Sequence, residues 1–387
     1  MFCMSAKKYP VHLGLFMMAY YMTNAVYQGY TSLYYTSKGF SSAQIGLIFA
    51  CVALTSVVAQ PIWGMCGDRV SNRTNLMRFL CAAAAVSMIA FLTSSSFLPL
   101  LLLGCLFACF YTSIQPMGDS VVLAKLNEHN QPFGPIRLCG GMAYAIASLI
   151  FGSFLNVPGR ENWCIYFTTG LCIIIGISTF ALPHTPGYQS QGKKMAFGAL
   201  LKDRELVKLM LFMLPLMITM GYFYSFFSPL FMTFEGSNGT LLGLCYFLSA
   251  VGEIPYLLMS DKLFEKLGAG KLMCISAVAL TIRWILLATT DNVVIAVLSQ
   301  LLHGWGFIVM TVSMAKHISR NVPKELQASG QMLLGMVSFG LARVVGNLGG
   351  GLLADAFGQQ NVFYLTAVIT VVTLVVFGPK FLKKKPA

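Results

Sequence analysis

Long apolar stretches alternate with short polar segments along this chain of 387 residues. A helix needs about twenty mainly apolar residues to cross the hydrocarbon core of a bilayer. By this measure the pattern predicts twelve transmembrane helices, and the fold class is an all-α membrane protein. The expected ranges are 10–35, 43–65, 75–95, 99–124, 136–156, 163–182, 207–234, 240–260, 271–289, 292–317, 327–354 and 361–382.

The composition indicates a multi-pass protein of the plasma membrane, since 57% of the residues are hydrophobic and only 10% are charged. The 26 Lys and Arg residues outnumber the 13 Asp and Glu residues. They lie in short loops and form no basic face, which excludes nucleic-acid binding. Most of the eleven cysteines fall inside apolar runs without a Cys-x-x-Cys pair. We therefore expect free thiols and no metal site.

The positions of the basic residues predict the orientation, because Lys and Arg in short loops stay on the cytoplasmic side. With both termini in the cytoplasm, 22 of these residues lie inside and two, Lys38 and Arg160, lie outside. The longest polar stretch separates a bundle of six helices in 1–182 from a second six-helix bundle in 207–387, with a cytoplasmic linker in 183–206. We expect the chain to work as a monomer.

A short charged motif occurs twice, 193 residues apart. The segment "GMCGDRVSNR" follows the second predicted helix, and "LLMSDKLFEK" follows the eighth. Each has an acid, a base one residue later and another base five residues later. Parallel repeats of this kind build transporters in which two bundles rock around a central site. The residues are Asp68, Arg69 and Arg73 in the first copy and Asp261, Lys262 and Lys266 in the second.

The first copy resembles the motif Gly-x-x-x-Asp-Arg-x-Gly-x-Arg of the major facilitator superfamily. Ser71 stands at the second glycine position, and the second copy lacks both glycines. The resemblance implies two pseudo-symmetric six-helix bundles and a cytoplasmic latch between helix ends. The residues that match the motif are Gly64, Asp68, Arg69 and Arg73. The acid and the two bases of the second copy are expected to belong to the same latch.

Several ionisable residues lie inside predicted helices, where a charge is costly unless it has a partner or a function. Glu253 is the only formally charged residue in 241–260. Residues at equal distances from the turn between two antiparallel helices lie at similar depth. By this rule Glu253, Arg283 and His303 share one layer near the middle of the bilayer. Arg343 is expected in the same layer.

Two pairs of embedded charges are candidate ion pairs. Arg283 is the candidate partner of Glu253, and Asp119 lies as far from the turn before the fifth helix as Arg137 does. An alternative is that such pairs only neutralise each other inside a bundle, or extend to the membrane interface. The presence of five or six embedded groups in one chain favours a functional layer.

The segments "PMGDSVVLA", "FGPIRLCGGMAYA", "VGEIPYLLMSDKLFEKLG", "LTIRWILLA" and "LLHGWGF" resemble the branch that contains lactose permease and the phenylpropionate permeases. The resemblance covers nearly the whole chain. It implies that Asp119 and Arg137 bind substrate. It also implies that Glu253 takes part in substrate binding and proton coupling, with Arg283 and His303 in the same network.

Three positions depart from lactose permease. Gly306 stands where that protein has a second carboxylate, Tyr144 replaces a stacking tryptophan, and Gln300 replaces a lysine. A galactoside substrate is therefore not expected, and Glu253 is the leading candidate for the proton site. Tyr144 is a candidate for substrate binding.

The embedded layer has two acids against three arginines. An organic anion would balance this excess, because a guanidinium holds a carboxylate with two parallel hydrogen bonds. Arg343 is therefore a further candidate for substrate binding. In the first helix, Asn24, Tyr27 and Gln28 lie near one face and are candidates for lining a cavity. The alternative for these residues is helix packing and an interfacial aromatic belt.

These observations favour a proton-coupled importer of a small organic solute, with an aromatic or other organic acid as the best-supported substrate. The alternatives are a proton symporter of sugars, oligosaccharides or nucleosides, and a drug or metabolite exporter that works by proton antiport. No His-Glu-x-x-His, Gly-x-Ser-x-Gly or P-loop motif occurs, so an enzyme is not expected. The expected partners are the substrate, a proton and the lipid bilayer. The proton gradient supplies the energy, and no cofactor is expected.

Overall fold

The structure is a computed structural model that describes residues 10–128, 131, 133–157, 159–185 and 197–382. Within these ranges every regular element is a helix. The first half of the molecule contains α1 (Val11–Ser37), α2 (Ser42–Arg69), α3 (Arg73–Ile89), η1 (Ala90–Thr93), α4 (Phe97–Tyr111), α5 (Ile114–Glu128), α6 (Gly134–Phe154), α7 (Trp163–Ser178) and η2 (Thr179–Ala181). The second half contains α8 (Phe197–Leu200), α9 (Arg204–Phe231), α10 (Gly239–Thr289), α11 (Val293–Ser299), η3 (Gly304–Ile308), α12 (Val309–Asn321), α13 (Lys324–Gly335), η4 (Met336–Leu341), α14 (Ala342–Phe357) and α15 (Gln359–Leu382).

The helices lie where the apolar pattern predicts them. Two of the predicted ranges, 240–260 and 271–289, are joined in α10, which bends at Gly268. Gly268 has a φ of 71°, a left-handed conformation that favours glycine. In the described ranges, ten helices are long and apolar enough to cross a membrane. The chain therefore has the construction of a multi-pass membrane protein.

Side-chain caps fix the start of several helices. At the start of α2, Ser41 and Gln44 form a capping box in which each side chain accepts a hydrogen bond from the backbone N–H of the other. Asp203 caps α9 and Asn238 caps α10 through backbone N–H groups of the first turn. With these caps, α2, α9 and α10 begin close to the first residues of the ranges predicted from the sequence.

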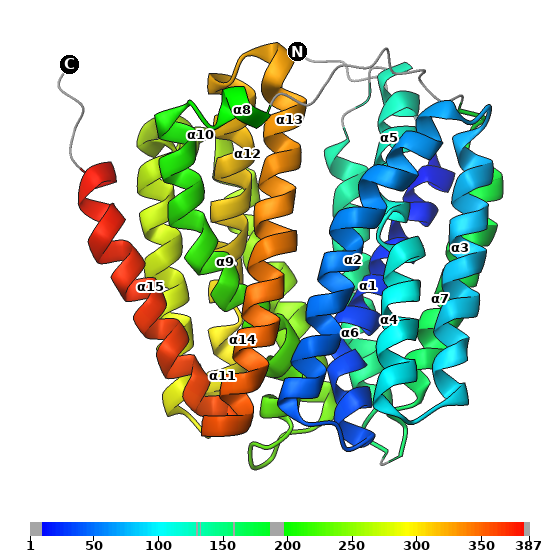
Figure 1. Ribbon diagram of the computed structural model, residues 1–387, viewed down its shortest axis with the longest axis horizontal. Helices are drawn as coiled ribbons and strands as arrows, with labels where there is room; N and C mark the ends of the chain where they lie inside the picture. The colour runs from blue at the N-terminus through cyan, green and yellow to red at the C-terminus, as the bar shows by residue number, and fades with distance from the viewer. Residues whose placement is uncertain (1–9, 129–130, 132, 158, 186–196, 383–387) are drawn as a thin grey trace, which may run out of the picture.

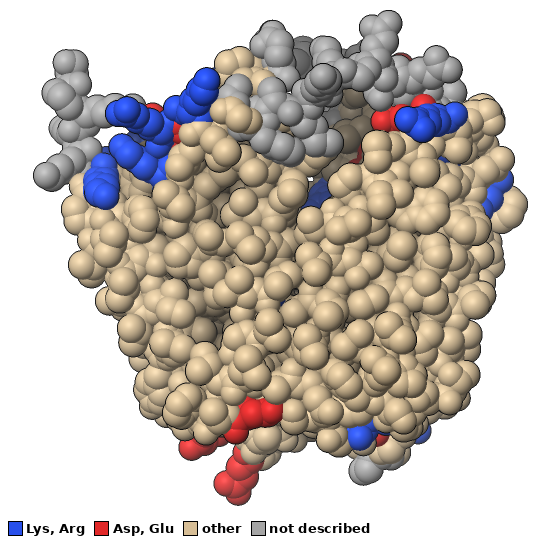
Figure 2. All heavy atoms as spheres, in the orientation of Figure 1, with Lys and Arg blue, Asp and Glu red and all other residues tan. Residues whose placement is uncertain are grey.

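The helices gather into two groups that correspond to the two halves (Figure 1). Within the first half, α1 packs against α6 and α7, and within the second half α10 packs against α15. Between the halves, α6 contacts α10, α2 contacts α14, and α1 contacts α9. The described part of α1 begins, and α15 ends, at the same end of the molecule (Figure 1). Figure 2 shows Lys and Arg side chains gathered at this end, which we call the basic end.

At the opposite end, each half caps a helix of the other half. The carboxylate of Asp355, near the end of α14, accepts hydrogen bonds from the backbone N–H groups of Ser42 and Ala43 at 2.7 and 3.0 Å. The side-chain oxygen of Asn156, just after α6, accepts one from the N–H of Thr240 at 3.2 Å. The starts of α2 and α10 therefore obtain partners for N–H groups that a helix leaves free.

Glycines bring helix backbones together at the same end. A Cβ atom at Gly239 would lie 2.1 Å from the carbonyl oxygen of Gly152, and one at Gly46 would lie 2.3 Å from the carbonyl oxygen of Asn347. Only glycine fits at these two crossings, because small residues let helix backbones approach closely. At the basic end, by contrast, the surface between the two halves is hollowed (Figure 2).

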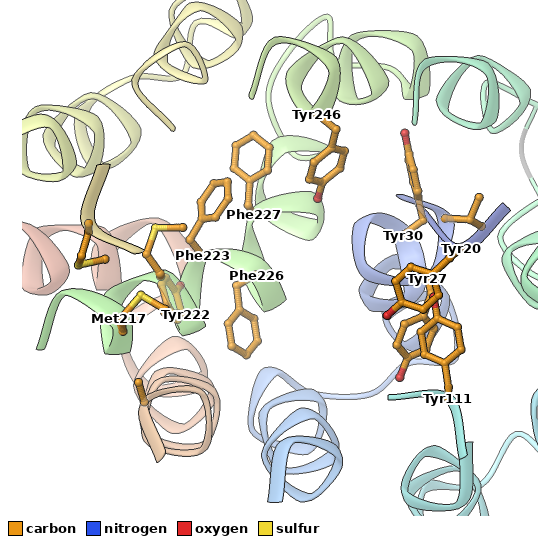
Figure 3. Packing of buried hydrophobic residues seen from close by; sticks show 14 of the residues in the cluster. Tyr20, Tyr27, Tyr30, Tyr111, Met217, Tyr222, Phe223, Phe226, Phe227 and Tyr246 are labelled. Atoms are coloured by element: carbon orange, nitrogen blue, oxygen red, sulfur yellow. The ribbon is translucent and has the colours of Figure 1, made fainter. Parts of the chain in front are cut away.

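Aromatic side chains fill the interior of both halves (Figure 3). In the first half, the ring centroid of Tyr27 lies 4.7 Å from that of Phe107 and 6.0 Å from that of Tyr111. In the second half, the centroids of Phe223 and Phe227 are 4.8 Å apart. Of these rings, Phe223 lies against two embedded polar residues, with its centroid 4.0 Å from the Arg283 guanidinium and 6.3 Å from the His303 ring centroid.

Candidate functional site

Glu253 lies in α10, against the π-helical turn η3 that follows His303. A Cβ atom at Gly304, the first residue of this turn, would lie 2.1 Å from the carbonyl oxygen of Gly252. The glycine at 304 therefore lets the two backbones meet close to the acid and the imidazole. Single π-helical turns are frequent at functional sites.

Arg283 is held by neutral partners. Its side chain is fully buried, and its guanidinium donates hydrogen bonds to Nδ1 of His303 at 2.9 Å and to Oε1 of Gln300. The Gln300 amide donates in turn to the carbonyl oxygen of Ala296 at 3.0 Å and to Oγ of Ser299 at 3.2 Å. Because arginine only donates, Nδ1 of His303 is the acceptor. The neutral imidazole then carries its proton on Nε2.

The expected ion pair between Glu253 and Arg283 is not formed. Instead, Oε1 of Glu253 lies 3.7 Å from Nε2 of His303, so the imidazole stands between the acid and the arginine. The Tyr224 hydroxyl lies 3.4 Å from the same nitrogen. The Glu253 side chain retains 26% of its accessible surface. The three residues share one layer, as the turn geometry predicts, but their order is acid, imidazole, arginine.

The second candidate ion pair, between Asp119 and Arg137, is not a direct contact either. Within the described part of the chain, no ion pair of 4.0 Å or less joins Asp119 to Arg137, and their attraction acts over a longer distance. Oδ1 of Asp119 is buried and has no hydrogen-bond partner among the described residues. The Arg137 guanidinium lies over the Tyr21 ring, 5.0 Å from its centroid. The Gln115 amide donates to the hydroxyl of that ring at 3.2 Å.

Arg343 reaches the same layer from α14. Its guanidinium lies over the ring of Tyr224, 5.0 Å from the centroid, and its Nε is buried with no hydrogen-bond partner among the described residues. Its helix α14 packs against α2 of the first half, and the Tyr224 hydroxyl lies 3.4 Å from Nε2 of His303. Arg343 therefore faces the junction of the two halves beside His303, in the layer where the sequence predicts it.

The three candidates on α1 take part in helix packing. Oδ1 of Asn24 accepts hydrogen bonds from the Gln28 amide at 3.1 Å and from the Tyr111 hydroxyl at 3.0 Å. Asn24 and Tyr27 each retain only 8% of their accessible surface, whereas Gln28 and Tyr144 are half-buried. These contacts are those of the packing alternative. A role of the four residues in substrate binding remains a prediction.

Comparison with known proteins identifies the family. The sequence model of the MFS_1 like family matches residues 11–365, nearly the whole chain. The chain belongs to this family. It is therefore a transporter of the major facilitator superfamily and an integral, multi-pass membrane protein.

Relatives of this MFS_1 like protein have similar lengths but different named substrates. The chain is 24% identical over 341 residues to the maltose permease of Geobacillus stearothermophilus. The alignment covers 87% of this chain and 85% of that protein. It is 21% identical over 363 residues to the "Probable 3-phenylpropionic acid transporter" of Escherichia coli (strain K12), covering 92% and 93%. The crystal structure of the nucleoside transporter NupG superposes with a TM-score of 0.84 at 17% identity, covering 97% of this chain and 99% of that one. This likeness shows the fold alone.

The repeated charged motif of this MFS_1 like protein lies at the basic end and differs between the two halves. In the first half, Arg73 forms an ion pair with Asp68 of the same motif. In the second half, Asp261 forms ion pairs with Lys316 at 2.7 Å and Arg320 at 3.4 Å, both on α12. The acid of each copy therefore has a basic partner, but only the first copy supplies that partner itself.

The other latch candidates have fewer contacts. Gly64, Arg69, Lys262 and Lys266 are exposed. A Cβ atom at Gly64 would meet no atom within 4 Å, so packing does not require glycine there. The participation of these residues in a latch remains a prediction.

Sequence reasoning did not single out Tyr21 and Tyr224, the rings beneath two of the arginines. Both lie in segments crowded with aromatic residues, "MAYYMTNAVYQGY" and "GYFYSFF", where the pattern gives no reason to prefer one ring. Gln300 stands out in the sequence only as a replaced lysine. A Cβ atom at Gly306, where the second carboxylate is absent, would lie 2.5 Å from the Leu280 side chain, so a larger residue there requires that side chain to move.

Proposed function

We propose that this transporter imports an aromatic or other organic acid together with protons. The observation that carries the proposal is the central layer, where Glu253 retains accessible surface beside a neutral His303. A carboxylate that exchanges a proton next to the substrate is what proton coupling requires, and ionisable groups inside a membrane usually mark such a path. No cofactor takes part in the proposed cycle, since the proton gradient supplies the energy.

An organic anion fits the charge of the layer. Arg137 and Arg343 each lie over a tyrosine ring, and within the described ranges neither has a carboxylate oxygen at 4.0 Å or less. A guanidinium with one face on a ring still offers the N–H groups of its edge to a carboxylate. The name of the Escherichia coli relative, which cites 3-phenylpropionic acid, supports this substrate class.

The proposed architecture has twelve membrane-spanning helices, with a bundle in 1–182, a linker in 183–206 and a bundle in 207–387. The ten apolar helices become twelve when α10 is counted as two spans and α1 is added. The basic end then faces the cytoplasm together with both termini. Most of the linker lies outside the described residues. The closed opposite end and the hollow at the basic end support an inward-facing carrier that works as a monomer.

In the proposed cycle, Glu253 and the substrate change their electrostatic partners together. The carboxylate of Glu253 attracts Arg137 of the other half. Protonation removes this attraction and weakens the contact with His303, so that Arg137 becomes available to the acid group of the substrate. The carrier reorients only when it holds both proton and substrate, or neither.

Transport by proteoliposomes tests the assignment. With an alkaline interior, the wild-type protein is expected to accumulate radiolabelled 3-phenylpropionate. The variant Glu253→Gln should exchange the substrate across the membrane without accumulating it, because a neutral amide cannot carry the proton. Glu235→Gln, in an exposed turn, is the matched control and should accumulate normally. Normal accumulation by Glu253→Gln would contradict the role of this residue.

A proton symporter of sugars or nucleosides is the second candidate, because half-buried tyrosines border the layer and would stack on a sugar or a base. The names of the maltose permease and NupG agree with this alternative. A thermal-shift screen of sugars, nucleosides and aromatic acids, repeated with Arg137→Ala, separates the two candidates. Membrane vesicles of known orientation then distinguish import from export by proton antiport.

A further inference from the structure

The first half presents an arginine stacked on a tyrosine whose hydroxyl is held by a third side chain. Arg137 lies 5.0 Å from the ring centroid of Tyr21, and the Gln115 amide donates to the Tyr21 hydroxyl at 3.2 Å. We call these three residues the first arginine unit. They come from α6, α1 and α5, which occupy the fifth, first and fourth of the predicted ranges.

The second half repeats this unit. Arg343 lies 5.0 Å from the ring centroid of Tyr224, and the Tyr224 hydroxyl lies 3.4 Å from Nε2 of His303. This second arginine unit comes from the eleventh, seventh and tenth predicted ranges. Each member is therefore six helices further along the chain than its counterpart. The internal repeat that the sequence shows at the basic end thus continues to the centre of the molecule.

Both arginine units border one region at the junction of the halves. Glu253 attracts Arg137 of the first unit over a longer distance, and its Oε1 lies 3.7 Å from Nε2 of His303 in the second unit. Glu253, Arg137 and Arg343 all retain accessible surface. Glu253 therefore lies beside both arginine units, one of which comes from each half.

The two units differ from Arg283 in the hydrogen-bonding capacity that they leave free. Arg283 is tied to Gln300 and His303. In the described part of the chain, neither Arg137 nor Arg343 has a carboxylate at contact distance, and Nε has no partner in Arg343, as is also the case in Arg283. Arg137 is exposed and attracts Glu253, whereas Arg343 lies between packed helices, where a guanidinium without an anion is unfavourable. When Glu253 is protonated, the three arginines of the layer face a single acid, Asp119, so a ligand with two negative charges would balance the layer.

We propose that the two arginine units are half-sites for one organic anion with an acidic group at each end, a dicarboxylate or a close analogue. The proposal rests on the proposed transport of organic acids and narrows its substrate class. Each acid group would bind the edge of one guanidinium, while the tyrosine covers the face of that group. The ligand would thereby join the two halves across the junction.

A series of ligands with two, one and no acid groups tests the proposal on the purified full-length protein. The ligands are benzene-1,4-dicarboxylate and straight-chain diacids of four to eight carbons, with the monomethyl and dimethyl ester of each. Isothermal titration gives the affinities. For at least one spacer length, the diacid is expected to bind about tenfold more tightly than its half-ester, which is the effect of one charge-assisted contact.

Substitution of each arginine then tests whether it binds one of the two acid groups of the diacid. In Arg137→Gln and in Arg343→Gln, the preference for diacid over half-ester should disappear, while the half-ester affinity changes by less than about threefold. Arg160→Gln is the matched control, since Arg160 also lies over an aromatic ring, Phe154, but away from the site. Melting curves verify folding, and Arg→Lys variants replace any glutamine variant that does not fold.

Two results would overturn the proposal that the two arginine units are half-sites for one ligand. One is equal binding of diacid and half-ester at every spacer length, and the other is a preference that persists in both arginine variants. The proposed function fails separately. If a diacid binds as expected but is not accumulated along a proton gradient, proton-coupled import is wrong and the half-sites stand. If a monoacid is accumulated along a proton gradient but diacids bind no more tightly than half-esters, the half-sites are wrong and proton-coupled import stands.

Discussion

The two halves of the molecule hold their embedded arginines in different ways. In the second half, Arg283 is fully buried, donates to Gln300 and His303, and stacks on Phe223 with 4.0 Å to the ring centroid. In the first half, Arg137 is exposed and lies over a single ring. The difference indicates two uses of one residue type. Arg283 fixes the geometry beside Glu253, whereas Arg137, under the proposed function, keeps its hydrogen-bond donors for a ligand.

The largest expected effect separates these two arginines directly. Arg283→Ala leaves acceptors of Gln300 and His303 without partners and removes a buried side chain, so we expect a loss of about 3 kcal/mol in the free energy of unfolding and a loss of transport. Arg137→Ala should change stability by less than about 0.5 kcal/mol but weaken the binding of a diacid about tenfold. Thermal unfolding and titration calorimetry measure the two effects. Equal destabilisation by both variants would remove the distinction.

The two glutamines beside the arginine sites, Gln300 in the second half and Gln115 in the first, provide a smaller contrast. Gln300 is fully buried and accepts the Arg283 bond, so Gln300→Ala is expected to cost about 2 kcal/mol in stability and to slow transport. Gln115 is half-buried and donates one hydrogen bond, to the Tyr21 hydroxyl, so Gln115→Ala should cost about 0.5 kcal/mol. Chemical unfolding of both variants checks the order. A larger loss for Gln115→Ala would show that the first half is the more rigid one.

The helix caps at the closed end extend the comparison. Asp355 brings a full negative charge to the start of α2, whereas Asn156 brings a neutral amide to the start of α10. Asp355→Ala is therefore expected to favour opening of this end by about 1 kcal/mol, and Asn156→Ala by about half as much. Spin labels on the exposed residues Ser95 and Asp291, one in each half, report the separation. Unchanged distance distributions in Asp355→Ala would show that the glycine crossings alone keep the end closed.

The smallest effect is expected for the charged motifs at the basic end. The Arg73 side chain is 9% exposed where it meets Asp68, whereas the Asp261 side chain is 74% exposed where it meets Lys316. Asp68→Asn should lower stability by about 0.5 to 1 kcal/mol, and Asp261→Asn should leave the melting temperature unchanged. Melting curves at low and high salt compare them. A strong salt-dependent effect of Asp261→Asn would indicate that the second copy is the tighter latch.

The helices were predictable because each must present about twenty apolar residues to lipid, a requirement that acts on the sequence one segment at a time. The layer of Glu253, Arg283 and His303 was also predictable, since depth follows from the distance to a turn. The contacts between the residues of this layer were not predictable. The sequence indicated an acid bonded to an arginine, but the packing of α10 against η3 places His303 between them and gives Arg283 the neutral Gln300 instead.

By itself, the sequence determined the membrane location, the helix ranges, the repeated motif and the depth of the embedded charges, all of which depend on local composition and on counting along one helix. Only the tertiary structure decided which side chains meet. Tyr21 and Tyr224 lie beneath arginines that are more than a hundred residues away in the sequence. The rotation of each helix about its axis selects one ring from several, and that rotation is set by the packing of all neighbouring helices together.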